Sequence, residues 1–426
     1  MRGVLRGQEG QIPEADRRHA PEDLIALTII VTGVERLADP APFLADVRRE
    51  AEAFCPGAEI VPLASGPEGI GAALRKAFRA SRAEFIITVD PDVSGPMAFL
   101  RDLWAHRLDG EIVIASRYVP GSRAEMTRLR AAGSRLLNAA FRRALSFGVR
   151  DVSSALRLYH ARAINGLTLQ ANGYDILQEA LVRAYAAGWR ICEIPMRYAP
   201  NPDVRTKAHR SLTTAYVRTA WALWKLRNSI AAADYDFRAH DSVIPLQRYW
   251  QRSRYRYVTE LTAGEGAVLD VGCGSSHIIG ALPRGSVALD ILANKLRFSR
   301  RFRVPLVRGT GAALPFRDGA FPCVLCSQVI EHVPKEPSVI DELCRVLKPG
   351  GRLVLGTPDY DRLEWVYIEK LYGRFAPGGY ADEHISHYTR RSLLADFARR
   401  GYTHEATRYV LRGELILAFR KPSARQ

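Results

Sequence analysis

The chain has 426 residues, of which 47% are hydrophobic and 25% are charged, an ordinary composition for a globular protein. Its length predicts two or three domains, and its composition excludes a mainly disordered, collagen-like or disulfide-scaffold chain. The six cysteines are scattered, which indicates a reducing compartment. The net charge is +16, but the basic residues are spread without a long run, so we expect no nucleic-acid partner.

The first 22 residues are polar and mixed in charge, and we expect a disordered tail there instead of a signal peptide. No stretch of 18 apolar residues follows, so a membrane-spanning helix is not expected. The abundance of Arg and Ala is typical of a GC-rich, bacterial-type genome. We therefore expect a cytoplasmic protein.

Short apolar runs alternate with segments of helical spacing through the first half of the chain. Strands are predicted at Leu27–Val31, Glu59–Leu63, Glu84–Val89 and Glu111–Ala115, and helices at Pro40–Phe54, Gly69–Arg82 and Pro96–Arg107. Such alternation predicts a mainly parallel sheet that is covered by helices on both faces.

A second alternation begins near residue 253. Its strands are predicted at Ala267–Val271, Ser286–Leu289, Phe321–Ser327 and Arg352–Gly356. The predicted fold class is therefore α/β, with two doubly wound domains. We expect a tail at 1–22, a first domain at 23–210, a helical connecting segment at 211–252 and a second domain at 253–426.

A strand, a carboxylate and a glycine turn follow one another in VLDVGCGSS (Val268–Ser276). In open α/β sheets ligands bind beyond the carboxyl ends of the strands, and glycine lets the backbone come close to a ligand. Asp290 ends the next predicted strand, 20 residues after Asp270, a spacing that suits a carboxylate on ribose hydroxyls. Taken alone, this pattern also fits NAD.

The segments LPFRDGAFPCVLCSQVIEHV and ELCRVLKPGGRLVLGTPDY make residues 250–420 closely resemble class I S-adenosylmethionine-dependent methyltransferases. The resemblance implies a Rossmann-like second domain with S-adenosylmethionine as its cofactor. The cofactor contacts that it implies are Asp270, Gly272 and Gly274 at the methionine part, Asp290 at the ribose, Thr310 near the adenine, and Glu331 after the fourth strand.

Methyl transfer from a sulfonium is an in-line displacement with a neutral leaving group, so it depends mainly on alignment. A base is needed only where a hydroxyl or amine acceptor must lose its proton. Candidates are His332, His384 and His387, although a single histidine is more often a structural hydrogen-bonding residue than a base. Cys323 and Cys326 form a lone CxxC in an apolar run, for which we expect core packing.

Two carboxylates, Asp90 and Asp92, follow a buried strand of the first half in VDPDVSG. They predict either a solvated turn with a helix cap or a Mg²⁺ or Mn²⁺ site that holds a diphosphate. The segments ASRYVPGS, DVSSALRLYHARAI and GYDILQEALVRAYAAGWRICEIPMRY make residues 60–210 resemble family 2 glycosyltransferases of the GT-A fold. The likeness is greatest to the branch of dolichyl- and polyprenyl-phosphate sugar synthases.

This second resemblance also implies site residues. They are Asp90 and Asp92 for the metal, Ser116, Arg117 and Arg157 for the substrate, and Asp151 or Glu179 as the base for a hydroxyl acceptor. Basic residues after Pro195, among them Arg197 and Arg205, predict a site for an acceptor phosphate or a solvated loop. The family's second strand and its VDDGS turn are missing, so the domain is truncated at its first nucleotide-binding strands.

The sequence predicts a bifunctional enzyme that acts on a glycan, a glycolipid or a lipid-linked sugar. Its expected partners are a nucleotide sugar as glycosyl donor and a glycan or polyprenyl-phosphate-type acceptor. The alternative is a non-catalytic, glycosyltransferase-like binding module fused to an active methyltransferase. Ser211–Ile230, with Trp221 and Trp224 beside basic residues, predicts either peripheral binding at the inner membrane face or a helix packed between domains.

Overall fold

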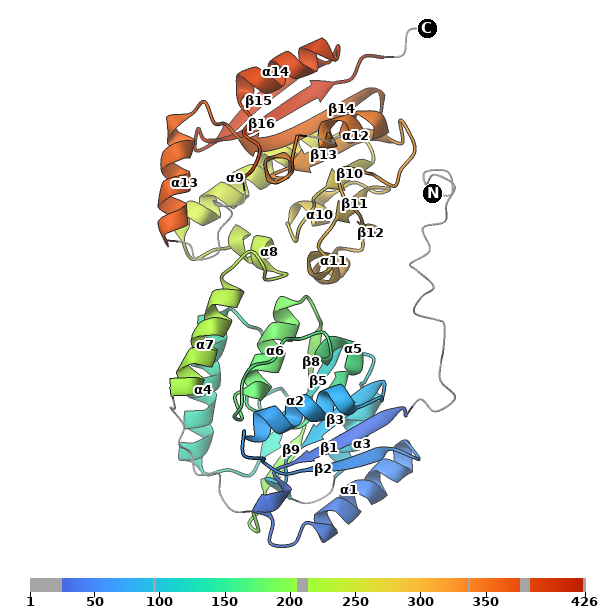
Figure 1. Cartoon of the computed structure of the whole chain (residues 1–426), viewed down its shortest axis with the longest axis vertical. Helices are drawn as coiled ribbons and strands as arrows, with labels where there is room; N and C mark the ends of the chain where they lie inside the picture. Colours follow the sequence, from blue (N-terminus) through green and yellow to red (C-terminus); the bar gives the residue numbers. More distant parts are fainter. Residues whose placement is uncertain (1–24, 95–96, 205–213, 336–337, 376–383, 424–426) are drawn as a thin grey trace. The chain divides into compact units, whose positions relative to one another are not determined.

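The computed structural model describes residues 25–94, 97–204, 214–335, 338–375 and 384–423 (Figure 1). The predicted tail at 1–22 lies outside these residues. The chain forms two compact units that meet in the sequence between Arg227 and Asn228, and each unit has its own sheet. The α/β class that the sequence predicts is confirmed.

The first unit is built on a six-stranded sheet, in the order β2 (Glu59–Leu63), β1 (Leu27–Thr32), β3 (Phe85–Val89), β7 (Arg157–His160), β5 (Ile112–Ser116) and β8 (Ile191–Pro195). β7 is antiparallel to its two neighbours, and the other strands pair in parallel. A small second sheet joins β4 (Val93–Ser94), β9 (Arg197–Pro200) and β6 (Arg123–Ala124).

Helices cover both faces of the larger sheet (Figure 1). The helices of this unit are α1 (Ala41–Phe54), α2 (Ile70–Ala80), α3 (Ala98–Ala105), α4 (Arg128–Leu145), α5 (Ala161–Ile164), α6 (Ile176–Ala186) and α7 (Thr214–Arg227), of which α7 packs on α4 and α6. Successive residues of a strand point to opposite faces. In β1, Ile29 therefore joins the core under α1 and α3, whereas Ile30 joins the core under α2 and α6. Because both faces are buried, β1 is apolar throughout.

The four strands that the sequence predicts in the first half all form, as β1, β2, β3 and β5. Only β2 lies between α1 and α2 along the chain, and it forms the edge of the sheet. This arrangement agrees with the strand and VDDGS turn that are missing from the sequence.

The second unit is built on a seven-stranded sheet, in the order β12 (Leu306–Arg308), β11 (Val287–Asp290), β10 (Val268–Val271), β13 (Phe321–Ser327), β14 (Leu347–Pro358), β16 (Glu414–Arg420) and β15 (Thr403–Val410). β16 is antiparallel to both of its neighbours. β10 pairs in parallel with β11 on one side and β13 on the other, so the strand order reverses at β10. Ligands bind at such reversals, beyond the carboxyl ends of the strands.

The helices of the second unit are α8 (Tyr235–His240), α9 (Pro245–Thr262), α10 (Ile278–Ala281), α11 (Ala293–Ser299), α12 (Val339–Val346), α13 (Leu363–Phe375) and α14 (Arg390–Arg399). The unit boundary falls inside the predicted connecting segment 211–252. α7 belongs to the first unit, where Thr219 Oγ1 donates to Asp175 Oδ2 (2.8 Å), and α8 and α9 belong to the second. None of the described helices is long and apolar enough to cross a membrane.

All six cysteines are free thiols. Cys323 and Cys326 of β13 are fully buried, and burial raises the pKa of both thiols, in agreement with the predicted core packing. Cys55 in the first unit and Cys273 in the second are also buried, whereas Cys192 and Cys344 are partly exposed. Each unit therefore contains buried and accessible thiols.

Candidate active sites

A tight glycine turn follows β10 in the second unit. Gly272 N and Cys273 N both donate to Leu289 O (2.8 and 3.1 Å), which holds the turn against β11. Gly272 has a φ of 73°, and a Cβ atom there would lie 2.1 Å from Val329 Cγ2. Gly274 also has a positive φ, of 55°. Only glycine fits at position 272. Without a side chain there, a ligand can approach the backbone of the turn closely, at the point where the strand order reverses.

Two buried carboxylates flank this turn. Asp290 Oδ2 accepts from Gly274 N (2.8 Å) and Asp290 Oδ1 from Leu292 N (2.7 Å), so the backbone fixes this carboxyl group. Among the described residues, none donates a hydrogen bond to the Asp270 carboxylate, which is 4% exposed. Burial, and then the charge of Asp290, raise the pKa of Asp270 to about 7. A buried acid without a partner fits a cationic or hydroxyl-bearing ligand.

Residues that sequence reasoning missed close one side of the turn. Asp236 of α8 accepts from Ser275 N (3.3 Å) and Ser275 Oγ (3.1 Å) and pairs with Lys295 Nζ (3.0 Å). Lys295 is buried and also donates to Ala232 O (3.1 Å). These contacts anchor α8 onto the glycine turn, although no motif in the sequence marks them.

Thr310 follows β12 and lies next to the carboxyl end of β11, which is formed by Asp290. Gly309 N donates to Asp290 O (3.1 Å), and the Thr310 hydroxyl accepts from Ala312 N (3.3 Å). The residue is exposed. Its contact with an adenine ring stays a prediction.

A polar cluster follows β13, beside the turn. Val329, which packs on Gly272, directly precedes the short helix Ile330–His332 that carries Glu331 and His332. Glu331 is fully buried; Thr357 Oγ1 donates to its Oε2 (3.3 Å), and its Oε1 has no partner among the described residues. Burial raises the pKa of Glu331 to about 8.

His384 is held against this cluster. Ile385 N and Ser386 N donate to Glu331 O (2.9 and 3.0 Å), and the His332 and His384 ring centroids are 4.8 Å apart. The remaining predicted histidine, His387, is exposed and stacks on Tyr360, with ring centroids 4.0 Å apart. The structure therefore brings together two of the three candidate bases.

The His384 ring is oriented by residues that the sequence did not reveal. Its Nδ1 lies 2.9 Å from Glu369 Oε1 of α13 and 2.9 Å from the Tyr360 hydroxyl. The same hydroxyl donates to Glu369 Oε1 (3.1 Å). Because a carboxylate only accepts hydrogen bonds, Nδ1 carries the proton and Nε2 is the basic nitrogen of the neutral ring.

Arg254 of α9 interacts electrostatically with acids of both the glycine turn and the polar cluster. It donates twice to the fully buried Glu414 (2.6 Å for both bonds). Burial opposes its charge, but the charges of Glu414, Asp236 and Glu331 raise the pKa of Arg254. The glycine turn and the polar cluster thus share one electrostatic environment.

The predicted metal-binding pair of the first unit is engaged by an arginine. Asp90 and Asp92 both pair with the guanidinium of Arg36, which follows β1. Burial opposes the charge of Arg36, but Asp90 and Asp92 raise its pKa above the usual value. In this arrangement the two acids hold an organic cation where the sequence predicts a metal ion, and they do not fit a metal.

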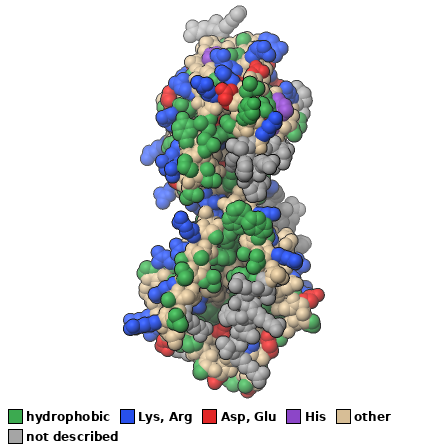
Figure 2. Space-filling view, turned by 90° about the vertical axis from the view of Figure 1, so that its left-hand side faces the viewer, with side chains coloured by type: hydrophobic (Ala, Val, Ile, Leu, Met, Phe, Trp, Pro, Cys, Tyr) green, Lys and Arg blue, Asp and Glu red, His purple; other side chains and the backbone are tan. Residues whose placement is uncertain are grey.

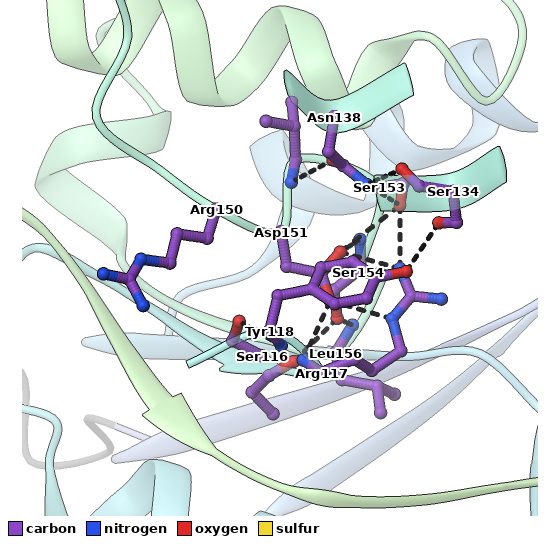
Figure 3. A network of polar contacts seen from close by, with 12 residues as sticks. Ser116, Arg117, Tyr118, Ser134, Asn138, Arg150, Asp151, Ser153, Ser154 and Leu156 are labelled. Atoms are coloured by element: carbon purple, nitrogen blue, oxygen red, sulfur yellow. Dashed lines mark hydrogen bonds and ion pairs between the residues drawn. The ribbon is translucent and has the colours of Figure 1, made fainter. Parts of the chain in front are cut away.

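Asp151 lies in a hydrogen-bond network with Arg117 (Figure 3). Arg117 Nε and Nη2 donate to its two oxygens (2.8 and 2.7 Å), and Ser154 N donates as well (3.0 Å). Burial opposes ionisation, but the Arg117 contacts hold the pKa of Asp151 below its usual value. Ser116 Oγ accepts from Tyr118 N (3.2 Å) in the same network. A carboxylate held ionised by this many donors is a weak base.

Two other predicted residues of the first unit also bind within the fold. Arg157 is fully buried and donates to Leu177 O (2.5 Å) and Val152 O (2.8 Å). Glu179 is also buried, and its acceptors are filled by Gln170 N, Ala171 N and Arg183 Nε (2.8, 2.8 and 2.7 Å). Arg197 is exposed on β9, and Arg205 lies outside the described residues. Their predicted substrate and base roles stay predictions.

Comparisons with known proteins point to methyl transfer. Residues 269–355 match the family model described as a methyltransferase domain. The malonyl-[acyl-carrier protein] O-methyltransferase of Methylococcus capsulatus is 31% identical over 175 residues, which are 38% of this chain and 62% of that protein. The demethylmenaquinone methyltransferase of Shouchella clausii is 36% identical over 152 residues, 31% of this chain and 64% of that protein.

Glycosyltransferase AglD of Haloferax volcanii is 30% identical over 162 residues, which are 36% of this chain and 26% of AglD. The chain thus spans less than two thirds of each of these relatives. Among solved structures, magnesium protoporphyrin IX methyltransferase from Synechocystis, with bound SAH, is 18% identical and covers 42% of this chain and 89% of its own (TM-score 0.34). Geranyl diphosphate C-methyltransferase from Streptomyces coelicolor is 14% identical over 44% and 81% (TM-score 0.35).

Proposed function

We propose that the second unit is an S-adenosylmethionine-dependent methyltransferase. The observation that carries the proposal is the unpartnered, buried Asp270 beside a turn that only glycine can form. The Asp290 carboxylate, which backbone hydrogen bonds hold in place, would accept hydrogen bonds from the ribose hydroxyls. Thr310 would lie near the adenine. When bound, S-adenosylmethionine supplies an electrophilic methyl group. The methyltransferase family match and the two relatives support this assignment.

We propose that the methyl acceptor is a hydroxyl group, with His384 as the base. His384 Nε2 would take the proton of the acceptor hydroxyl as its oxygen receives the methyl group, while the methyl–sulfur bond of the donor would break and leave a neutral thioether. Glu369, at His384 Nδ1, stabilises the imidazolium that results. His332 is the second candidate, because its ring faces the same cluster. An acceptor that is already an anion would require neither histidine.

Calorimetric titration of the full chain with S-adenosylmethionine tests the cofactor. Asp290→Ala should weaken binding by about 1.5–3 kcal/mol, because hydrogen bonds to a charged acceptor are lost. Asp203→Ala serves as the matched control, since Asp203 is exposed in the first unit. Equal affinity in the wild type and Asp290→Ala would refute the ribose contact, and no binding by the wild type would refute the proposal.

For the first unit we propose a glycosyltransferase-like module that recognises the sugar part of a glycan, a glycolipid or a lipid-linked sugar. The likeness to AglD supports the family, and the internal hydrogen bonds of Asp151, Arg157 and Glu179 favour recognition over catalysis. Glycosyl transfer from a nucleotide sugar to a polyprenyl-phosphate-type acceptor is the alternative. Incubation with radiolabelled nucleotide sugars and a lipid extract separates the two, because only the alternative gives labelled lipid.

We also propose peripheral membrane binding through α4 and α7, which are neighbours joined by a hydrogen bond from Arg227 Nε to Leu145 O (3.0 Å). Leu129 and Leu136 of α4 are 85% and 73% exposed, and Trp221 of α7 is 55% exposed. Neither helix contains Asp or Glu, and both contain several basic residues. Figure 2 shows hydrophobic side chains gathered on this face of the first unit, with basic side chains beside them. Such a surface fits an anionic bilayer.

A further inference from the structure

The turn after β1 brings a cation onto the acids that follow β3. β1 ends at Thr32, and Gly33 takes a left-handed conformation with a φ of 69°. A Cβ atom on Gly33 would lie 2.7 Å from Arg36 Nε, so the glycine provides the space that the arginine occupies. The short helix Val34–Arg36 then directs the guanidinium towards the neighbouring strand.

Both carboxylates contact this one guanidinium. Arg36 Nη2 pairs with Asp90 Oδ1, and Arg36 Nη1 pairs with Asp92 Oδ1. Asp92 N also donates to Asp90 Oδ1 (3.0 Å). The side chains of Arg36 and Asp90 are only 11% and 5% exposed, so water screens the pair weakly. Because an arginine is not deprotonated in proteins, the positive charge at this position is permanent.

A metal ion would need the same oxygen atoms. Mg²⁺ binds carboxylate oxygens at about 2.0–2.1 Å and demands near-octahedral geometry, and the guanidinium covers one oxygen of each acid. The ion could bind only after Arg36 had left, and Arg36 would then lose both of its partners and repel the ion. The two cations therefore exclude each other.

We infer that Arg36 is the built-in counter-cation of the Asp90–Asp92 pair and that it keeps Mg²⁺ and Mn²⁺ out of this site. The inference does not depend on the methyltransferase proposal, because it concerns only the first unit. It means that any nucleotide or sugar taken up beside Asp90 is bound without a metal ion. It also means that the acid pair, which in sequence resembles a catalytic motif, fastens β1 to β3.

Mn²⁺ titration of the full chain, followed by electron paramagnetic resonance of the free ion, tests the inference. Arg36→Ala should bind one Mn²⁺ more than the wild type, because it removes the guanidinium that covers one oxygen of each carboxylate. The double variant Arg36→Ala with Asp92→Asn should lose that gain. Two clusters of the second unit, Glu331–His332–His384 and His240–Asp241–His277, have metal-ligand groupings, and any ion there contributes equally to every variant.

Thermal unfolding with and without Mn²⁺ gives a second readout. Mn²⁺ should raise the midpoint of the first-unit transition of Arg36→Ala towards the wild-type value and leave the first-unit midpoint of the wild type unchanged. If Arg36→Ala does not fold, comparison of the wild type with Asp92→Asn decides: equal Mn²⁺ binding supports the inference. Loss of one bound Mn²⁺ from the wild type on Asp92→Asn would overturn it, as would a folded Arg36→Ala that gains none.

Discussion

Asp270 is a buried acid whose charged form the fold disfavours. Its pKa is raised to about 7, whereas an aspartate in an unfolded chain titrates near 4. Between these two values the folded chain keeps the proton and the unfolded chain does not. Its contribution to stability is therefore complete below about pH 4 and is lost as the pH rises through 7.

Asp270→Asn should consequently stabilise the ligand-free protein, and more so at high pH. The gain in unfolding free energy should grow by about 2–3 kcal/mol between pH 5 and pH 8, because asparagine has no charge to bury. Urea unfolding of both proteins at the two pH values measures this difference. A gain that is independent of pH would contradict the assigned cause. The variant should also lose S-adenosylmethionine affinity.

At the same scale, His384 and Glu369 should differ in their effect on methyl transfer. His384→Gln should slow turnover about 10²–10⁴-fold, as expected for loss of a general base, without changing the affinity for S-adenosylmethionine. Glu369→Gln should slow turnover less than His384→Gln does, because the imidazole loses its orienting carboxylate but keeps its basic Nε2. Transfer of a radiolabelled methyl group to a glycolipid extract measures both. A full rate in His384→Gln, with loss in His332→Gln, would move the base to His332.

Among the elements, α4 and α7 combine exposed apolar side chains with several basic residues and contain no acidic residue. Leu136→Ser with Trp221→Ser should abolish sedimentation with anionic vesicles at low salt, and high salt should release the wild type. Exposed cations near an anionic surface contribute about 1 kcal/mol each, so the binding is weak and sensitive to salt. Trp224 is left intact, since it packs against the core.

The control for this experiment is Leu108→Ser, which removes another exposed apolar residue (71% exposed) outside the two helices. Its sedimentation should equal that of the wild type. Equal loss in the control and in the double variant would indicate a general effect of surface polarity and would contradict a specific membrane-binding face.

The elements could be predicted where burial leaves a pattern along the chain. β1 and β13 are apolar because both of their faces are covered, and the glycine turn after β10 is local in sequence. The pairs Arg36–Asp90, Asp236–Ser275 and Glu369–His384 could not be predicted. Their members are 54, 39 and 15 residues apart, and only folding brings them together. The sequence therefore predicts which acids lie at the strand ends, but not which cations or bases face them.

On the scale of the whole molecule, the two units contain separate hydrophobic cores. Residues of β1 and β3 form cores of the first unit, and residues of β10 and β13 form cores of the second. Calorimetry of the full chain should therefore give two unfolding transitions. S-adenosylmethionine at 100 times its Kd should stabilise one of them by about 2.7 kcal/mol and leave the other unchanged. A shift of both transitions would contradict independent unfolding.

The distribution of the thiols allows transient opening of each unit to be followed by cysteine labelling of the unmodified chain. Cys192 and Cys344 are partly exposed, one in each unit, and should react with a maleimide before the buried thiols do. Cys55 of the first unit and Cys323 of the second are buried, so each reacts only when its unit opens. The slow labelling phases, assigned by peptide mass, would therefore time the opening of each unit separately in the unmodified protein.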